Sequence, residues 1–358
     1  MKQYKVGIVG ATGMVGQRFT LLLENHPWFD VVALAASGRN KGKTYAEACE
    51  GRWKMTVPMP GKYKDMVMYD ATADAEEIAS KVDFIFCAVD MKKDEIRALE
   101  EKYAKLECPV CSNNSAHRGT PDVPMIIPEI NADHAEIIPA QRKRLGTKRG
   151  FIAVKSNCSI QSYVPALSAL MDFEPTEVSV CTYQAISGAG KTFETWPEMV
   201  DNVIPYIGGE EEKSEKEPMK IWGHIEGDHI EPTPVISAQC LRVACSDGHM
   251  AAASVKFKNK PSKEVMIERW NNFKGRAQEL NLPSAPEHYL TYFEEDNRPQ
   301  TKLDRNLENG MGVSIGRLRE DTIFDYKFVS LSHNTLRGAA GGAVLMAELL
   351  CAEGYMDR

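Results

Sequence analysis

The N-terminal segment decides the fold: residues 6–16 read Val-Gly-Ile-Val-Gly-Ala-Thr-Gly-Met-Val-Gly. Residues 4–9 are predicted to form a buried strand, and the Gly-x-x-Gly-x-x-Gly spacing after it is typical of a turn into a helix that binds a dinucleotide. Gly10 and Gly13 would permit a tight turn and close approach of a pyrophosphate at the helix N-terminus, while Gly16 would let the helix pack on the strand. The alternative is a glycine-rich turn without a ligand. The glycines predicted to lie against the dinucleotide here are Gly10 and Gly13.

The end of the second predicted strand, residues 30–36, indicates which dinucleotide binds. In NAD sites this strand usually ends in an acid that binds the ribose 2′-hydroxyl. Here it is followed by Ser37-Gly38-Arg39, with Lys41 and Lys43 close behind. A hydroxyl and several cations suit a 2′-phosphate, so we predict NADP(H), with Ser37 and Arg39 as its contacts. A solvated basic loop is the alternative.

The candidate nucleophile is Cys158, in Lys155-Ser156-Asn157-Cys158-Ser159. Apolar residues 151–154 precede this stretch, and a helix is predicted to begin near Ile160. A thiol at such a junction would face the positive end of the helix dipole, which predicts a lowered pKa and a thiolate able to attack a carbonyl carbon. A buried structural cysteine is the alternative.

The candidate acid/base is His249, which follows an Asp-Gly pair at 247–248. This pair predicts a hairpin between strands 235–243 and 249–257. Arg242 would lie on the outgoing strand, and it could project into one cleft with His249. Two ordinary residues at the end of a hairpin are an equally weighted alternative.

The order of the predicted elements indicates an α/β fold with two domains. Strands and helices alternate in the first half, as in a Rossmann-type doubly wound sheet, and a second α+β domain with a mixed sheet follows Cys158. The predicted boundaries are 1–156 for the NADP-binding domain, completed by residues 334–358, and 157–333 for the catalytic and dimerisation domain. Further predicted strands are 82–89, 109–112 and 177–186; predicted helices are 92–105, 264–280 and 343–351.

Composition limits the classes of protein. The chain has 358 residues, a net charge of −7 and 43% hydrophobic residues, as expected for a globular enzyme without a nucleic-acid partner. No apolar run predicts a membrane span or a signal peptide. Nine scattered cysteines favour a reducing cytoplasm, and Cys108 and Cys111 lack the further ligands of a metal site, so no metal is predicted. The charged run at 210–217 is predicted to be a solvated face.

Taken together, the ordered motifs resemble the aspartate-β-semialdehyde dehydrogenases, specifically their archaeal and fungal-like branch, over essentially the whole chain. The motifs that carry the resemblance are residues 10–16, Asn113 to Arg118, Pro128 to Asn131, Ser156 to Ser159, Gln184 to Gly190, Glu217 to Lys220, Arg242 to His249 and Asn334 to Ala340. The second domain would then be of the semialdehyde and glyceraldehyde-phosphate dehydrogenase type.

The resemblance implies a role for each matching residue. Cys158 would form an acyl-thioester, His249 would be the acid/base, and Gln184 would orient the acyl group. The substrate would be bound by Arg118, Asn157, Glu217, Lys220 and Arg242, with Arg242 on its carboxylate, Glu217 on its amine, and Lys220 and Arg118 on phosphate. Thr12, Met14 and Val15 would bind NADP at the glycine-rich turn. Ala88, Ser187, Gly188 and Asn334 would complete the NADP site.

The implied reaction is the reversible NADPH-dependent reductive dephosphorylation of L-aspartyl-4-phosphate to the semialdehyde, on the route to lysine, threonine, methionine and isoleucine. The family implies a homodimer or homotetramer. Malonyl-CoA reductase and N-acetyl-glutamyl-phosphate reductase share the chemistry and stay as alternatives, although Glu217 and Lys220 argue against the first. An NADP-sensing regulatory Rossmann protein is the non-enzyme alternative, and it would not need Cys158, His249 and Arg242.

Overall fold

The structure is a computed structural model that describes residues 3–227, 229–231 and 235–357. Residues 1, 2 and 358, at the ends of the predicted segments 1–156 and 334–358, lie outside the described residues. So does part of the segment 201–234, whose role the sequence leaves open.

A six-stranded parallel sheet forms the first half of the chain. Its strand order is β3-β2-β1-β4-β5-β6, which is the order of a doubly wound dinucleotide fold. The strands are β1 (Tyr4–Val9), β2 (Phe29–Ala36), β3 (Tyr69–Asp70), β4 (Phe84–Cys87), β5 (Val110–Ser112) and β6 (Ile152–Val154). The Rossmann-type prediction is therefore confirmed, and the predicted strand 82–89 is shorter than expected.

The glycine-rich turn lies at the carboxyl end of β1, before α1 (Met14–Leu23). Gly10 has φ +97°, and a Cβ there would lie 2.3 Å from the carbonyl oxygen of Ala88. A Cβ at Gly16 would lie 2.2 Å from the carbonyl oxygen of Gly10. At Gly13 the nearest atom would be 3.6 Å away, so the protein itself does not require glycine there. Gly10 and Gly16 thus shape the turn, and Gly13 leaves room above it.

The remaining helices of the first half are α2 (Tyr45–Ala48), α3 (Gly61–Lys64), α4 (Ala75–Lys81), α5 (Lys93–Lys105) and α6 (Ile138–Leu145). The C-terminal helix α12 (Gly341–Ala352) returns to this sheet and contacts α1 and β5. Its buried side chains, among them Leu345 and Leu349, belong to the same apolar cluster as Val6 and Phe86. The last helix therefore packs where its small and apolar residues predict.

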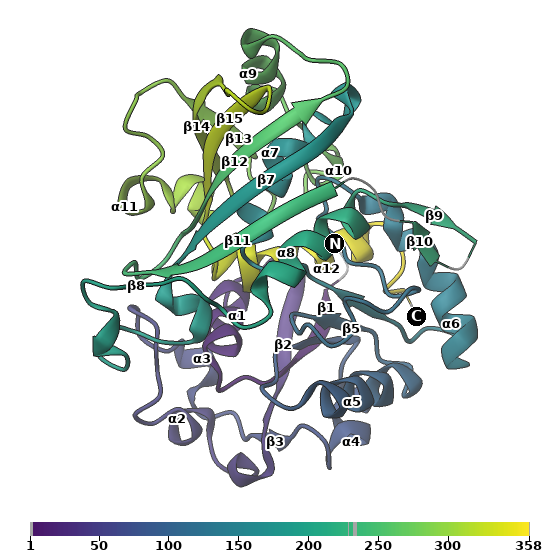
Figure 1. The fold of residues 1–358 in the computed structure, drawn as a ribbon. Coiled ribbons are helices and arrows are strands. Elements are labelled where there is room, and N and C mark those ends of the chain that lie inside the picture. Colours follow the sequence, from purple (N-terminus) through teal and green to yellow (C-terminus); the bar gives the residue numbers. More distant parts are fainter. Residues whose placement is uncertain (1–2, 228, 232–234, 358) are drawn as a thin grey trace.

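The second half contains a seven-stranded mixed sheet, with strand order β13-β14-β15-β12-β7-β11-β8. Figure 1 shows this sheet above the parallel one, with α8 (Glu210–Ile221) below β11. The strands are β7 (Pro175–Gln184), β8 (Val203–Ile204), β11 (Val235–Val243), β12 (His249–Phe257), β13 (Leu290–Phe293), β14 (Val313–Glu320) and β15 (Tyr326–Ser332). A separate two-stranded sheet pairs β9 (His224–Glu226) with β10 (His229–Glu231). The domain boundaries at 156 and 333 stay a prediction.

The predicted hairpin at Asp247-Gly248 is wrong. β11 pairs in parallel with β7, and β12 pairs with the other edge of β7, so β7 separates the two strands. The segment between Val243 and His249 therefore crosses from one side of β7 to the other. The carboxyl ends of β7 and β11 and the beginning of β12 therefore lie at the same end of the sheet, which brings their residues together in the candidate site.

The predicted helix 264–280 is also wrong as a single element. It is divided into α9 (Lys263–Asn271) and α10 (Arg276–Glu279). Gly275 explains the break: a Cβ there would lie 2.0 Å from the carbonyl oxygen of Glu129, so the chain passes too close to that backbone for a helix to continue with a side chain at this point. Glycine in the middle of a helix is also unfavourable in itself.

Candidate active site

Cys158 and His249 meet between the two sheets. The Sγ of Cys158 lies 3.4 Å from Nε2 of His249. Cys158 comes from the loop after β6, and His249 is the first residue of β12. Gly338, in the segment before α12, closes the other side, because a Cβ there would lie 2.9 Å from the Cβ of Cys158. A nucleophile and a base within reach of each other are the central requirement of thiol catalysis.

The backbone determines which nitrogen of His249 carries the proton. The N–H of Ala185 donates to Nδ1 at 3.0 Å. Because an amide N–H can only donate, Nδ1 accepts, and the proton of the neutral ring lies on Nε2, toward the sulfur. Burial, helped by Arg242 and His333, lowers the pKa of His249 well below its usual value. The ring is therefore neutral at physiological pH, with an Nε2–H that donates into the site.

The predicted lowering of the Cys158 pKa is wrong for the enzyme without substrate. Burial raises the pKa of the thiol, and so does the Glu210 carboxylate, against the opposing effects of Lys155, Arg118 and Arg242. The elements after Cys158 explain the error: a three-residue 3₁₀ turn (Ile160–Ser162) and the five-residue helix α7 (Val164–Ser168) follow, instead of one long helix. Such short elements align few peptide dipoles.

Arg242 lies beside His249 as predicted, although not through a hairpin. A Cβ at Gly188 would lie 2.9 Å from Nη1 of Arg242 and 3.0 Å from Nε2 of His249, so both side chains face the backbone of Gly188. Arg242 is buried and donates to the carbonyl oxygen of Ala185 at 2.6 Å. It pairs in register with Gln184 across β11 and β7. Arg242, His249 and Gly188 thus share one cleft.

The residues predicted near the nicotinamide also gather here. Asn334 donates from Nδ2 to the Oγ of Ser187 at 2.8 Å and accepts from the N–H of Gly248 at 2.8 Å. These bonds join the turn after β7, the segment before β12 and the segment after β15. Ser187 and Asn334 are consequently fixed next to Gly188 and His249.

Helix α8 contributes two buried carboxylates, so the run at 210–217 is more than a solvated face, as the resemblance implies for Glu217. Glu217 accepts from Nη1 of Arg118 at 3.1 Å and from the N–H of Asn157 at 2.6 Å. Glu210 accepts from the side-chain amides of Asn157 (3.0 Å) and Gln184 (3.3 Å) and from Lys213 (2.6 Å). Two glutamates, about two turns apart, therefore face inward from one side of α8.

Asn157 and Lys220 have their polar atoms bound within the protein. The side chain of Asn157 bonds Glu210 and Ser159. The Nζ of Lys220 donates to the carbonyl oxygens of Arg118, Thr120 and Val123 at 2.8–2.9 Å. Burial lowers the pKa of Lys220 to about 8. Both residues hold the loops that carry Cys158 and Arg118, and their direct contact with substrate stays a prediction.

A cleft of about 490 Å³ lies at the carboxyl ends of the parallel strands. Of the predicted cofactor residues it is lined by Gly10, Thr12, Gly13, Ser37, Arg39 and Ala88. Met14 and Val15 are the first residues of α1, directly after this turn. The Nζ of Lys41 forms an ion pair with Asp74 at 2.6 Å, and Lys41 is not among the residues that line the cleft. Arg39 and Ser37 are exposed at its rim.

Sequence reasoning missed two residues of these sites. Arg52 lines the cofactor cleft beside Arg39, but it follows α2 by four residues and no motif points to it. The Glu210 carboxylate is the charged group that raises the pKa of Cys158 most, but in the sequence it is one of several glutamates in a charged run. The spacing of seven between Glu210 and Glu217 was the available signal, since it places both on one helical face.

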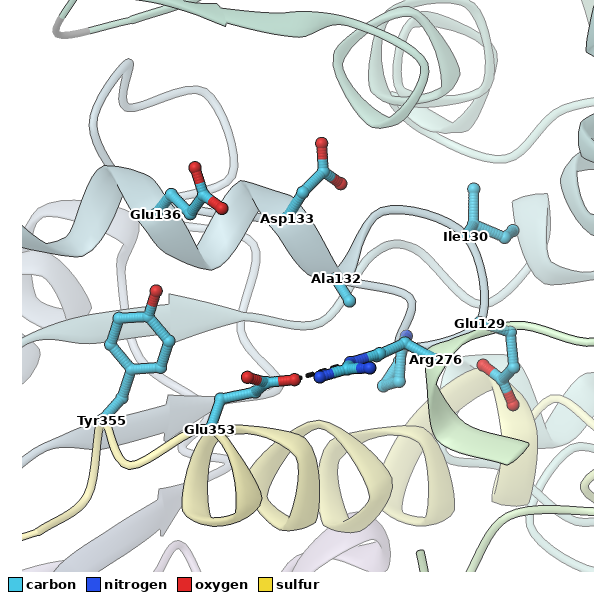
Figure 2. A pocket seen from close by; sticks show the side chains of 9 residues that line it. Glu129, Ile130, Ala132, Asp133, Glu136, Arg276, Glu353 and Tyr355 are labelled. Atoms are coloured by element: carbon cyan, nitrogen blue, oxygen red, sulfur yellow. Dashed lines mark hydrogen bonds and ion pairs between the residues drawn. The ribbon is translucent and has the colours of Figure 1, made fainter. Parts of the chain in front are cut away.

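Another cavity lies away from this chemistry. Figure 2 shows it between residues 132–136 and the end of α12, where Arg276 and Glu353 form an ion pair at 2.7 Å. Its volume is about 380 Å³, and no cysteine, histidine or lysine lines it. Neither Cys158 nor His249 lines it, so it is separate from the candidate active site.

The described part of the chain shows neither a metal cluster nor a membrane-spanning helix. Within it, no cluster of three or more histidine, cysteine, aspartate or glutamate side chains is arranged to hold a metal ion. None of the helices in the described ranges combines the length and apolar character needed to cross a membrane.

Comparison with known proteins agrees with this geometry. Residues 5–138 match the family described as "Semialdehyde dehydrogenase, NAD binding domain", and residues 167–337 match "Semialdehyde dehydrogenase, dimerisation domain". The chain is 41% identical to the aspartate-semialdehyde dehydrogenase of Aspergillus fumigatus, covering 98% of each chain, and 41% identical to that of Archaeoglobus fulgidus, covering 98% of this chain and 99% of the relative. The crystal structure of the Candida albicans enzyme with NADP superposes with a TM-score of 0.89 at 36% identity, covering 99% of this chain and 100% of that one.

Proposed function

The chain belongs to the aspartate-semialdehyde dehydrogenase family, and on this premise we propose that Cys158, His249 and Arg242 carry out its reaction. The reaction is the reversible, NADPH-dependent reductive dephosphorylation of L-aspartyl-4-phosphate to L-aspartate-4-semialdehyde, within the biosynthesis of lysine, threonine, methionine and isoleucine. The observation that carries the proposal is the 3.4 Å separation of the Cys158 Sγ and the His249 Nε2.

Cys158 is the proposed nucleophile. Its thiolate attacks the acyl carbon of aspartyl-4-phosphate, so a C–S bond forms, the bond from that carbon to the phosphate oxygen breaks, and inorganic phosphate leaves. The product is a thioester on Cys158. NADPH, when bound, supplies the hydride that reduces this thioester. The resulting thiohemiacetal then collapses, which breaks the C–S bond and releases the semialdehyde.

His249 is proposed to act through Nε2. Because Nδ1 accepts from Ala185, the Nε2–H is available to the sulfur and to the substrate oxygen that becomes negative at each tetrahedral stage. Nε2 has no free lone pair in this tautomer, so His249 acts on this oxygen as a hydrogen-bond donor. Gln184 is proposed to orient the acyl group; it is buried at the end of β7, one residue before Ala185.

The substrate clamp uses charges of both signs. Arg242 is proposed to bind the α-carboxylate, since a guanidinium can donate two parallel hydrogen bonds to it. Glu217 is proposed for the α-amine and Arg118 for the phosphate; the two are already paired at 3.1 Å, so substrate would exchange with this ion pair. Asn157 and Lys220 support the clamp by holding its loops.

The residues of the cofactor cleft fit NADP(H). Gly13 leaves space above the turn, and Arg39 and Arg52 place two guanidinium groups in one cleft with the Ser37 hydroxyl. The Nδ2 of Asn40 is buried and has no hydrogen-bond partner among the described residues, so it is a further donor beside this loop. Arg39 and Ser37 would bind the 2′-phosphate, and Ser187, Gly188 and Asn334 would lie near the nicotinamide.

Malonyl-CoA reductase is not favoured as the function, because that substrate has no α-amine for Glu217. A regulatory NADP-binding protein is not favoured either, since it has no use for a thiol held against a histidine. Because the chain carries the dimerisation domain of its family, it is an oligomer, and we propose a homodimer or homotetramer. We further propose a cytoplasmic location, which suits a chain with nine scattered cysteines.

An assay of NADP reduction with the semialdehyde tests the proposal. Turnover should require inorganic phosphate, and Cys158→Ser should lower it to less than about a tenth of wild type, because a serine hydroxyl is not ionised at neutral pH without strong activation. Cofactor binding to the variant is the control for folding. Turnover that proceeds with coenzyme A in place of phosphate would instead support an acyl-CoA reductase.

A further inference from the structure

Lys155 is a buried cation that the mechanism above does not use. It lies three residues before Cys158, in the loop after β6, and is 1% exposed. Its Nζ donates to the carbonyl oxygens of Ser156 and Gly338. Lysine is rarely buried without a carboxylate partner, because removing an ammonium group from water is costly. A buried lysine at this position therefore needs an explanation.

The two carbonyl partners place the ammonium group next to the nucleophile. Ser156 is on the loop that carries Cys158, and Gly338 packs directly against it: a Cβ at Gly338 would lie 2.9 Å from the Cβ of Cys158 and 3.3 Å from its carbonyl oxygen. The aliphatic stem of Lys155 passes beside Gly342, where a Cβ would lie 3.5 Å from Cδ. Lys155 thus joins both segments that enclose the thiol.

We propose that Lys155 is a positioning residue whose positive charge stabilises the thiolate of Cys158. The proposal rests on the function assigned to Cys158 above and adds the group that makes its thiolate accessible. A charge in a buried site acts more strongly than one in water, because the local dielectric is low.

The titration of the two groups supports this pairing. Burial, with Arg118, lowers the pKa of Lys155 to about 7, whereas the Cys158 thiolate raises it. In return, Lys155 is the foremost group that lowers the pKa of Cys158. Each charge therefore favours the other, and the two sites titrate as a coupled pair. The other charged or titratable groups that act on this pair are Arg118, Glu210, Glu217, Arg242, His249 and Arg337.

A purely structural role makes a different prediction. As a donor to two carbonyls, Lys155 could simply hold the loop to the segment before α12. An uncharged donor would then serve equally well. Charge and hydrogen bonding can therefore be separated by substitution.

The test is the rate of alkylation of Cys158 by iodoacetamide between pH 6 and pH 10, without substrate, read by mass spectrometry of the peptide that contains Cys158. Lys155→Met and Lys155→Gln remove the charge, and Lys155→Arg keeps it. At pH 6, below the Lys155 pKa of about 7, Lys155 carries its charge, and both neutral variants should be alkylated about tenfold more slowly than wild type, which corresponds to a thiol pKa raised by about one unit. Lys155→Arg should be alkylated at least as fast as wild type at this pH. Lys220→Met is the matched control, since Lys220 is another buried lysine bound to carbonyls, in a different loop.

The outcomes divide as follows. Slower alkylation at pH 6 in Lys155→Gln but not in Lys155→Arg supports the proposal, also where Lys155→Met fails to unfold cooperatively. Equal rates at pH 6 in the Gln and Arg variants overturn it, and so does a slowing of the same size in Lys220→Met. Because alkylation needs no turnover, this result is independent of the proposed reaction: loss of turnover in Cys158→Ser, together with unchanged alkylation in the Lys155 variants, would leave the function standing and remove only Lys155.

Discussion

Nε2 of His249 lies 3.4 Å from the sulfur of Cys158, while Nδ1 of the same ring accepts from the backbone of Ala185. The imidazole ring is therefore held from behind by β7 and presents one N–H to the reacting atoms. A ring fixed in this way cannot exchange the roles of its two nitrogens without breaking a backbone hydrogen bond.

Replacement of His249 tests this role. His249→Asn should lower kcat by roughly 10²–10⁴-fold, with a much smaller change in substrate affinity. Burial holds the pKa of His249 well below 6.5, so the ring stays neutral as the pH falls from 8 to 6, and wild-type kcat should show no loss from its protonation in that range. An acid limb centred near pH 6.5 that His249→Asn abolishes would contradict this assignment.

The substrate clamp should separate into two halves. Arg242→Leu should raise the KM for the semialdehyde much more than the KM for phosphate, and Arg118→Leu should do the reverse. Each lost charge-assisted contact should cost about 1.5–3 kcal/mol. Steady-state kinetics with each substrate varied in turn gives both constants, and identical responses of the two variants would show that the carboxylate and phosphate sites are wrongly divided.

Lys220 should act through the loop it holds. Because its Nζ binds three carbonyl oxygens at residues 118–123, Lys220→Ala should lower the thermal unfolding temperature as well as raise the KM for phosphate. Calorimetry beside kinetics distinguishes the roles. A variant that loses phosphate affinity at unchanged stability would restore Lys220 as a direct phosphate ligand.

Cofactor choice follows from the cleft at the end of β2. Wild type should bind NADP at least about tenfold more tightly than NAD, since a 2′-phosphate gains one charge-assisted contact or more. Arg39→Ala should weaken NADP and barely change NAD. Arg52→Ala is the companion variant, because Arg52 lines the same cleft. Titration of both cofactors measures this, and equal losses for NADP and NAD in Arg39→Ala would remove Arg39 from the 2′-phosphate.

Local patterns predicted much of this molecule. Strand–turn–helix order and the spacing of Gly10 and Gly16 predicted the parallel sheet, because steric requirements at these glycines are local. The strand predicted at 177–186 is β7, in which buried residues alternate with less buried ones from Val178 to Gln184. The position of β7 between β11 and β12 was not predicted, because the residues around the Asp-Gly pair carry no sign of which distant strand pairs with each of them.

The electrostatics of the site depended on tertiary packing. Glu210 and Lys155 come from segments far apart in the sequence, and both act on Cys158. A motif around the cysteine records neither the depth at which it is buried nor the carboxylate that α8 brings to it. For this reason the sequence could not predict whether the pKa of the Cys158 thiol is raised or lowered. It could, however, single out Cys158 as the candidate nucleophile.

The most direct test of a Cys158 thioester is rapid mixing of the enzyme with the semialdehyde and NADP in the absence of phosphate. The aldehyde carbon should be oxidised once on the sulfur, which gives a burst of NADPH equal to the enzyme concentration and an aspartyl group on the peptide that contains Cys158. Phosphate should then release this group and restore steady turnover. Steady turnover without phosphate, or an equal burst in Cys158→Ser, would contradict the thioester mechanism.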